Sequence, residues 1–123
     1  MEKKIMIVDD DPDLLVILRV LFEKKHFEVL TVDTGYDCLE ELKRGFSGII
    51  LMDLMMPFID GYTTIHEIIK QGYASQVKII IITASGKKDM NKYNDLEPYI
   101  YDYIQKPFNI ERLLTNIKLA YVE

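Results

Sequence analysis

The chain has 123 residues, of which 49% are hydrophobic and 28% charged, a balance typical of one folded domain and not of a disordered or membrane-spanning chain. Its net charge of -5 argues against direct binding of nucleic acid. Nonspecific binding to the phosphate backbone requires an excess of Lys and Arg, which this chain lacks. Cys38 is the only cysteine, so no internal disulfide can form, and we expect a cytoplasmic protein without membrane contact. A single domain over residues 1–123 is therefore expected.

Short runs rich in β-branched residues alternate with longer amphipathic stretches, a pattern that predicts a parallel sheet covered by helices on both faces. The first, third and fourth runs are apolar enough to be central strands buried on both sides, whereas the second and fifth are expected at the edges. The predicted strands are Lys4–Val8, Glu28–Val32, Ile49–Met52, Lys78–Thr83 and Tyr101–Ile104. Because side chains alternate along a strand, Tyr101 and Tyr103 are expected to face the same side.

Four of the five helices expected in this α/β chain begin after residues that cap helices well: Asp11, Thr34, Asp60 and Asn109. The remaining helix, the fourth in order, is expected to be short or mobile, because the segment from Gly86 to Pro98 is mostly polar.

Polar residues follow the predicted strands. Asp9 and Asp10 come directly after the first strand, Asp53 follows the third, Thr83 ends the fourth and Lys106 lies two residues beyond the fifth. In an open parallel sheet, ligands bind at the carboxyl ends of the strands. We therefore expect these five side chains to meet at one edge.

Three carboxylates at one place repel one another, and a divalent cation relieves that repulsion. Oxygen ligands favour Mg²⁺ over zinc, which prefers Cys and His, and neither His26 nor His66 lies at a strand end. With Mg²⁺ on one side and Lys106 and Thr83 on the other, the pocket suits a dianion carried on Asp53. The arrangement predicts phosphoryl transfer with the Asp53 carboxylate as nucleophile.

The same residues, in the same order, resemble the receiver domains of two-component response regulators. The resemblance covers the whole chain, and its segments are Ile5-Met6-Ile7-Val8-Asp9-Asp10, Met52-Asp53-Leu54-Met55-Met56-Pro57 with Asp60-Gly61, Ile82-Thr83-Ala84 and Asp102-Tyr103-Ile104-Gln105-Lys106-Pro107-Phe108. It implies a doubly wound, flavodoxin-like sheet of order 2-1-3-4-5 with five helices on both faces. Because the sequence has no Pro/Gly/Ser-rich linker, we expect no output domain in this chain.

The resemblance also implies roles for the residues around Asp53, the phosphoacceptor. Asp10, Asp53 and the Met55 carbonyl would bind Mg²⁺, and Asp9 would act through water. Lys106 would contact the phosphoryl group, next to a cis peptide bond to Pro107.

Thr83 and Tyr103 would form the switch, with Thr83 bonding the phosphoryl group and Tyr103 moving inward behind it. The chain would catalyse only its own phosphorylation and dephosphorylation.

The implied partners are a sensor histidine kinase and either a downstream target or a second phosphotransfer protein, bound by a monomer or a weak, phosphorylation-dependent homodimer. A phosphorelay shuttle is therefore an alternative function. A haloacid-dehalogenase-type phosphatase is a second alternative, which shares the strand-end aspartate and Mg²⁺. It is disfavoured because Asp13 stands where that class needs Thr or Val.

Overall fold

The computed structural model describes residues 3–84 and 94–122. Five parallel strands form one sheet in the order β2-β1-β3-β4-β5, so the predicted order and both predicted edges are confirmed. The strands are β1 Lys3–Val8, β2 Phe27–Val32, β3 Gly48–Asp53, β4 Val77–Thr83 and β5 Ile100–Gln105. Each predicted strand is therefore correct to within one residue at either end.

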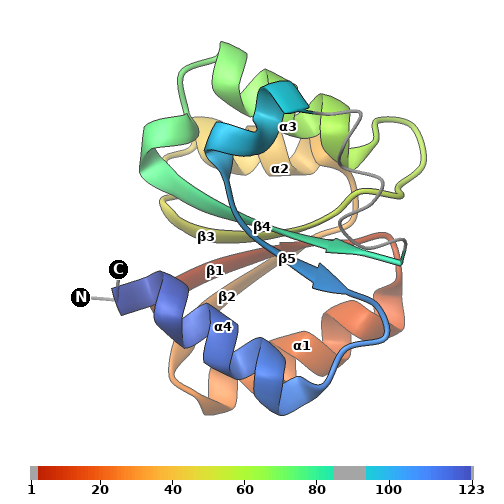
Figure 1. The fold of residues 1–123 in the computed structure, drawn as a ribbon, viewed down its shortest axis with the longest axis vertical. Coiled ribbons are helices and arrows are strands. Elements are labelled where there is room, and N and C mark those ends of the chain that lie inside the picture. Colours follow the sequence, from red (N-terminus) through yellow and green to blue (C-terminus); the bar gives the residue numbers. More distant parts are fainter. Residues whose placement is uncertain (1–2, 85–93, 123) are drawn as a thin grey trace.

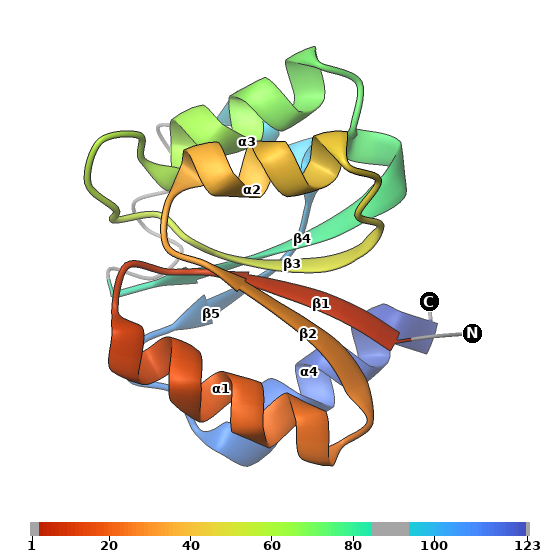
Figure 2. The same ribbon diagram turned by 180° about the vertical axis from the view of Figure 1, so that it is seen from behind.

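The helices lie on both faces of the sheet: α2 and α3 cover one face, and α1 and α4 cover the other (Figures 1 and 2). Their bounds are α1 Pro12–Lys24, α2 Gly35–Lys43, α3 Gly61–Lys70 and α4 Ile110–Val122, with a 3-10 turn, η1, at Ala74–Gln76. Most of the short helix expected between Gly86 and Pro98 falls outside the described residues, and residues 94–99 form 3-10 turns. No helix in the described ranges combines the length and apolar character needed to cross a membrane.

All four predicted caps are confirmed by hydrogen bonds from first-turn amides to the capping side chain, which replace partners that a helix start lacks. The amides of Asp13 and Leu14 donate to Asp11, that of Asp37 to Thr34, that of Thr63 to Asp60 and that of Arg112 to Asn109.

Alternation along the central strands divides the core into two layers. Ile5 and Ile7 of β1 belong to the layer beneath α1 and α4, whereas Met6 and Val8 belong to the layer beneath α2 and α3. All four side chains are fully buried. A one-residue slip of β1 would exchange its two faces, so the sheet register is strongly specified and fixes where each strand ends.

The prediction that Tyr101 and Tyr103 share a face is wrong. Ile79 pairs with Ile100 and Ile80 with Asp102, so Tyr101 is an extra residue in β5 at a register shift. An extra residue shifts the alternation of side chains on its strand. Tyr101 therefore packs against the layer of α1 and α4, beneath the Lys78 ammonium group at 5.1 Å from its ring, and Tyr103 packs against the opposite layer.

Candidate functional site

Three aspartates meet at the carboxyl edge of the sheet. Asp9 and Asp10 follow β1, Asp53 ends β3, and one carboxylate oxygen from each lies within 4.8 Å of the others. Asp9 and Asp53 are buried, with 1% and 4% of their surfaces exposed, while Asp10 is exposed. Because the two central strands β1 and β3 are neighbours, their ends bring together residues 43 or more positions apart.

Lys106 supplies the positive charge of this cluster. Its Nζ lies 2.9 Å from Asp9 Oδ2, as a hydrogen-bonded ion pair, and 3.7 Å from Asp53 Oδ2. Burial alone would lower the pKa of Lys106, but its hydrogen bond to Asp9 and the charges of the three carboxylates outweigh burial and raise that pKa. Lys106 therefore stays charged at neutral pH.

The Asp53 carboxyl group has a strongly raised pKa. Burial raises its pKa to about 6, helped by the charges of Asp9 and Asp10 and opposed by Lys106 and by a hydrogen bond from the Met55 amide, 3.1 Å from Asp53 Oδ1. A carboxylate with this pKa is ionised at neutral pH yet poorly solvated, which suits a nucleophile.

Thr83 ends β4 beside Asp53 and is 1% exposed. Asp53 pairs with Ile82, and Thr83 pairs with Gln105, so Thr83 lies between the end of β3 and the end of β5. Its carbonyl oxygen accepts a hydrogen bond of 2.9 Å from the Lys106 amide. The end of β4 thus fixes the backbone that carries Lys106.

The peptide bond between Lys106 and Pro107 is cis. It lies directly after β5, at the point where the chain turns from the sheet toward α4. Lys106 is therefore held from both sides, by the Thr83 carbonyl before the turn and by the Asp9 carboxylate across the site.

Two contacts of Asp9 were not predicted. The resemblance implies an Asp9 that acts through water, but here its Oδ2 binds Lys106 and its Oδ1 accepts a 2.9 Å hydrogen bond from the Asp11 amide. Asp9 and Lys106 are 97 positions apart, so no local pattern could have shown that they pair.

Gly61 is a further residue of the site, and neither the capping pattern nor the resemblance gives it a role. A Cβ at this position would lie 2.4 Å from the Asp53 carbonyl oxygen and 2.7 Å from Leu54 Cα, both backbone atoms. The Gly61 amide donates to the Leu54 carbonyl at 3.1 Å. The first turn of α3 thus packs directly against the strand end that carries Asp53, which requires glycine.

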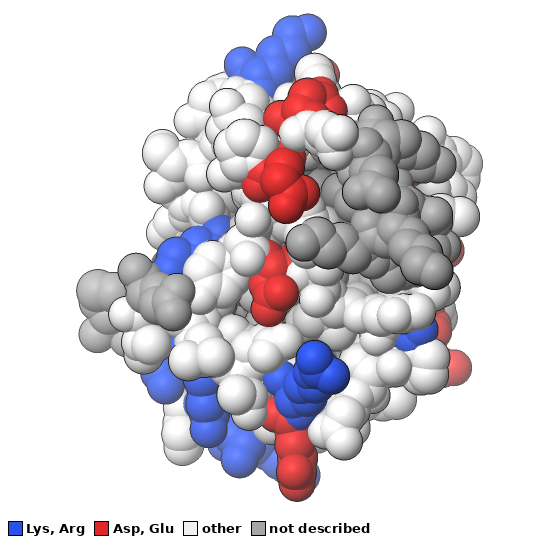
Figure 3. Space-filling model, viewed as in Figure 1, with Lys and Arg blue, Asp and Glu red and all other residues white. Residues whose placement is uncertain are grey.

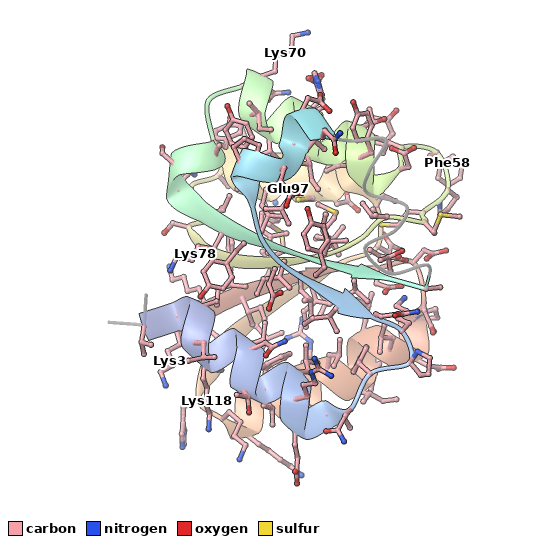
Figure 4. The ribbon with its side chains drawn as sticks, in the orientation of Figure 1. Lys3, Phe58, Lys70, Lys78, Glu97 and Lys118 are labelled. Carbon is pink, nitrogen blue, oxygen red and sulfur yellow. The ribbon has the colours of Figure 1, made fainter. Side chains whose placement is uncertain are left out.

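The loop between β3 and α3 forms one rim of the site. Leu54, Met56 and Ile59 are buried anchors, whereas Met55 is 70% exposed and Phe58 is 90% exposed. Phe58 projects from the loop into solvent and adopts a φ of +68°, a left-handed conformation that is unfavourable for an aromatic residue (Figure 4). The rim beside Asp53 therefore carries two exposed apolar side chains, Met55 and Phe58.

The acidic cluster fits Mg²⁺. Three carboxylate oxygens, all within 4.8 Å of one another, gather negative charge that a divalent cation would neutralise. The donors are all oxygen, as Mg²⁺ prefers, and the exposed Asp10 leaves room for coordinating water.

The chain belongs to the response regulator receiver domain family, whose family model it matches over residues 5–118. It is 36% identical over 115 residues to the transcriptional regulatory protein CpxR homolog of Haemophilus influenzae, an alignment that covers 94% of this chain and 48% of that protein. It is 32% identical over 117 residues to the probable transcriptional regulator ycf27 of Pyropia yezoensis, covering 95% and 46%. The chain thus spans about half the length of the curated relatives it matches.

Solved structures agree with this assignment. A CheY-like response regulator receiver domain protein from Methanospirillum hungatei superposes with a TM-score of 0.91 at 34% identity, over 99% of this chain and 96% of that one. The response regulator TrrA from Thermotoga maritima, in complex with Mg²⁺ and BeF, gives a TM-score of 0.80 at 26% identity, over 95% and 97%.

A third structure is the receiver domain of a sensor histidine kinase from Pseudomonas aeruginosa. It has magnesium coordinated in its active-site cleft and gives a TM-score of 0.86 at 26% identity over the full length of both chains.

The names of these relatives bear on the expected absence of nucleic-acid binding. Several curated matches are named transcriptional regulators, so the expected absence of nucleic-acid contact stays a prediction about residues 1–123 alone. The single-domain organisation also stays a prediction.

Proposed function

We propose that this receiver domain works as a phosphoryl-accepting switch in which Asp53 takes a phosphoryl group from a sensor histidine kinase or a small acyl phosphate. One observation carries the proposal: a buried carboxylate with a raised pKa lies 3.7 Å from a charged lysine and within 4.8 Å of two more aspartates. This combination supports the proposal, because it would supply a nucleophile, a cation and a metal-binding set at one point.

The transfer step balances without any further reactant. An oxygen of Asp53 forms a bond to phosphorus while the bond between phosphorus and the donor's histidine nitrogen breaks, and that nitrogen keeps the electron pair. The product is an acyl phosphate on Asp53. Lys106 and the Thr83 hydroxyl would stabilise the negative charge on the phosphoryl oxygens.

Mg²⁺ would be held by Asp10, Asp53 and the Met55 carbonyl, with Asp9 acting through water or directly. Bound there, the ion would supply positive charge to the phosphoryl oxygens. The two structural relatives solved with magnesium support this assignment, because their sites lie on the same fold. The chain would catalyse only its own phosphorylation and, with water as the attacking group, its own dephosphorylation.

The readout of phosphorylation would run through Thr83 and Tyr103. Thr83 lies beside Asp53 and pairs with the end of β5, and Tyr103 lies two residues earlier on that strand. A shift of Tyr103 toward an occupied site would alter the surface of β5 and α4, to which a downstream target, a second phosphotransfer protein or another copy of this chain would bind. A reducing cytoplasm is the proposed location.

Intact-mass measurement tests the proposal. Incubation with acetyl phosphate and Mg²⁺ should add the mass of one phosphoryl group, and Asp53→Asn should abolish the gain because an amide is a poor nucleophile. Asp10→Ala should weaken Mg²⁺ binding and slow the labelling.

The matched control is Asp60→Asn, since Asp60 lies on the same loop and Asn caps a helix as well as Asp does. It should label like the unaltered chain. Normal labelling of Asp53→Asn would overturn the assignment.

A further inference from the structure

The segment 94–99, which leads into β5, carries two acidic residues with different contacts. The first, Asp95, holds the segment to α3: its Oδ2 accepts a 3.4 Å hydrogen bond from the Tyr62 hydroxyl and lies 3.5 Å from His66 Nε2. Between the two acids, Leu96 is 1% exposed and packs into the layer beneath α2 and α3. The segment therefore has a fixed place against α3.

The second acid, Glu97, binds the side chain of the proposed switch residue. The Tyr103 hydroxyl donates a hydrogen bond to Glu97 Oε2. Burial raises the pKa of Tyr103, and the hydrogen bond and negative charge of Glu97 raise it further, so the phenol remains a proton donor. Figure 4 shows Glu97 at the turn just before β5, whereas Thr83 pairs with Gln105 at the other end of that strand.

We propose that Glu97 is a positioning residue that holds Tyr103 in its resting position and thereby lowers the affinity of the Asp53 site for a phosphoryl group. The inference rests on the proposed function, in which Tyr103 moves when the site is occupied. A bond made only in the resting position stabilises that position, and linkage requires its removal to favour the occupied state by the same factor. Asp95 and Leu96 support this role, because a fixed segment can hold Tyr103 where a free one could not.

The exposure of Glu97 limits the size of the effect. Acidic side chains lie at the surface over the segment 94–99 and over β5, where water and salt reach them (Figure 3). A hydrogen bond to a charged group in such a place is screened and competes with water, so we expect a change of about three- to tenfold in affinity and not more.

The test titrates the chain with beryllofluoride and Mg²⁺, a phosphoryl mimic, by isothermal titration calorimetry. Glu97→Ala should bind about three- to tenfold more tightly than the unaltered chain, and Glu97→Gln, which keeps an acceptor without the charge, should fall between the two. Glu40→Gln is the control: it removes one negative charge from the exposed surface of α2 and should leave the affinity unchanged.

A double-mutant cycle shows whether Glu97 acts through Tyr103. In a Tyr103→Phe background the hydroxyl is gone, so Glu97→Ala should no longer change the affinity. An effect that persists there, or an unchanged affinity of Glu97→Ala in the parent chain, would overturn the inference.

A second readout separates this inference from the proposed function. The pKa of Tyr103, followed by ¹³C NMR of its ring, should fall in Glu97→Gln whatever the site binds. If the pKa of Tyr103 falls in Glu97→Gln but the unaltered chain does not bind beryllofluoride, the proposed function is wrong. This inference, which rests on that function, is then wrong as well. If the unaltered chain binds beryllofluoride and the Glu97 variants match it, this inference alone fails.

Discussion

At the scale of single residues, the buried carboxylate of Asp53 makes stability depend on pH. Its pKa rises from 3.8 to about 6 on folding, mainly through burial, and at 1.36 kcal/mol per pKa unit this corresponds to about 3 kcal/mol. The folded state binds the proton more tightly than the unfolded state. Ionisation of Asp53 therefore destabilises the folded state. This destabilisation is absent below pH 3.8, develops as the pH rises to about 6 and is complete above it.

Asp53→Asn should remove this destabilisation, because the amide is never charged. We expect its free energy of unfolding at pH 7, without divalent cations, to exceed that of the parent by about 1–3 kcal/mol. The gain should shrink as the pH falls below 6 and vanish near pH 3.5. Urea unfolding at a series of pH values measures it, and a gain that is equal at pH 3.5 and pH 7 would show that ionisation of Asp53 is not its source.

Met55 is the residue beside Asp53 that bears on the lifetime of the acyl phosphate. Its exposed thioether side chain cannot orient a water molecule well for attack on phosphorus, whereas an amide can. Met55→Asn should therefore speed the loss of phosphate several-fold, followed by intact mass after removal of the donor. Phe58→Asn changes an exposed apolar residue of the same loop and should not alter the rate; equal acceleration by both variants would argue against a positioned water.

At the scale of elements, α3 and β3 are held together by the close contact at Gly61. A Cβ there would meet backbone atoms of Asp53 and Leu54, which cannot rotate away. Gly61→Ala should lower the free energy of unfolding by about 1–3 kcal/mol, as overpacking usually does. Thr63→Ala, on the exposed side of the same helix, should change it by less than about 0.5 kcal/mol. A similar loss in both variants would point to helix propensity and not to the contact.

The elements also show what sequence reasoning can and cannot predict. Strands and caps are local, so the apolar runs and the residues Asp11, Thr34, Asp60 and Asn109 sufficed to place them. The prediction for Tyr101 failed because strand periodicity assumes a regular strand, and the register shift beside Ile79 and Ile80 depends on pairing with β4. No pattern in β5 alone signals it.

At the scale of the whole molecule, topology explains which parts of the site were predictable. Parallel strands place their carboxyl ends at one edge, so the meeting of Asp9, Asp10, Asp53, Thr83 and Lys106 followed from the order of elements. The pairings within the site did not, because the choice of Asp9 as the partner of Lys106 depends on side-chain geometry across 97 positions. The bond between Tyr103 and Glu97 was missed for the same reason.

The long span between Asp9 and Lys106 also has a consequence for biosynthesis. β5 pairs only with β4 at the edge of the sheet, and Lys106 comes after it. A growing chain would therefore hold its acidic cluster without the cation until β5 and Lys106 have been made, and closing so long a loop is the slow kind of step in folding. Pulse-labelled hydrogen exchange during refolding should show protection of β1 and β3 no later than β5, with beryllofluoride binding appearing only when β5 is protected. A newly made chain would then be unable to hold a signal until its fifth strand has joined the sheet.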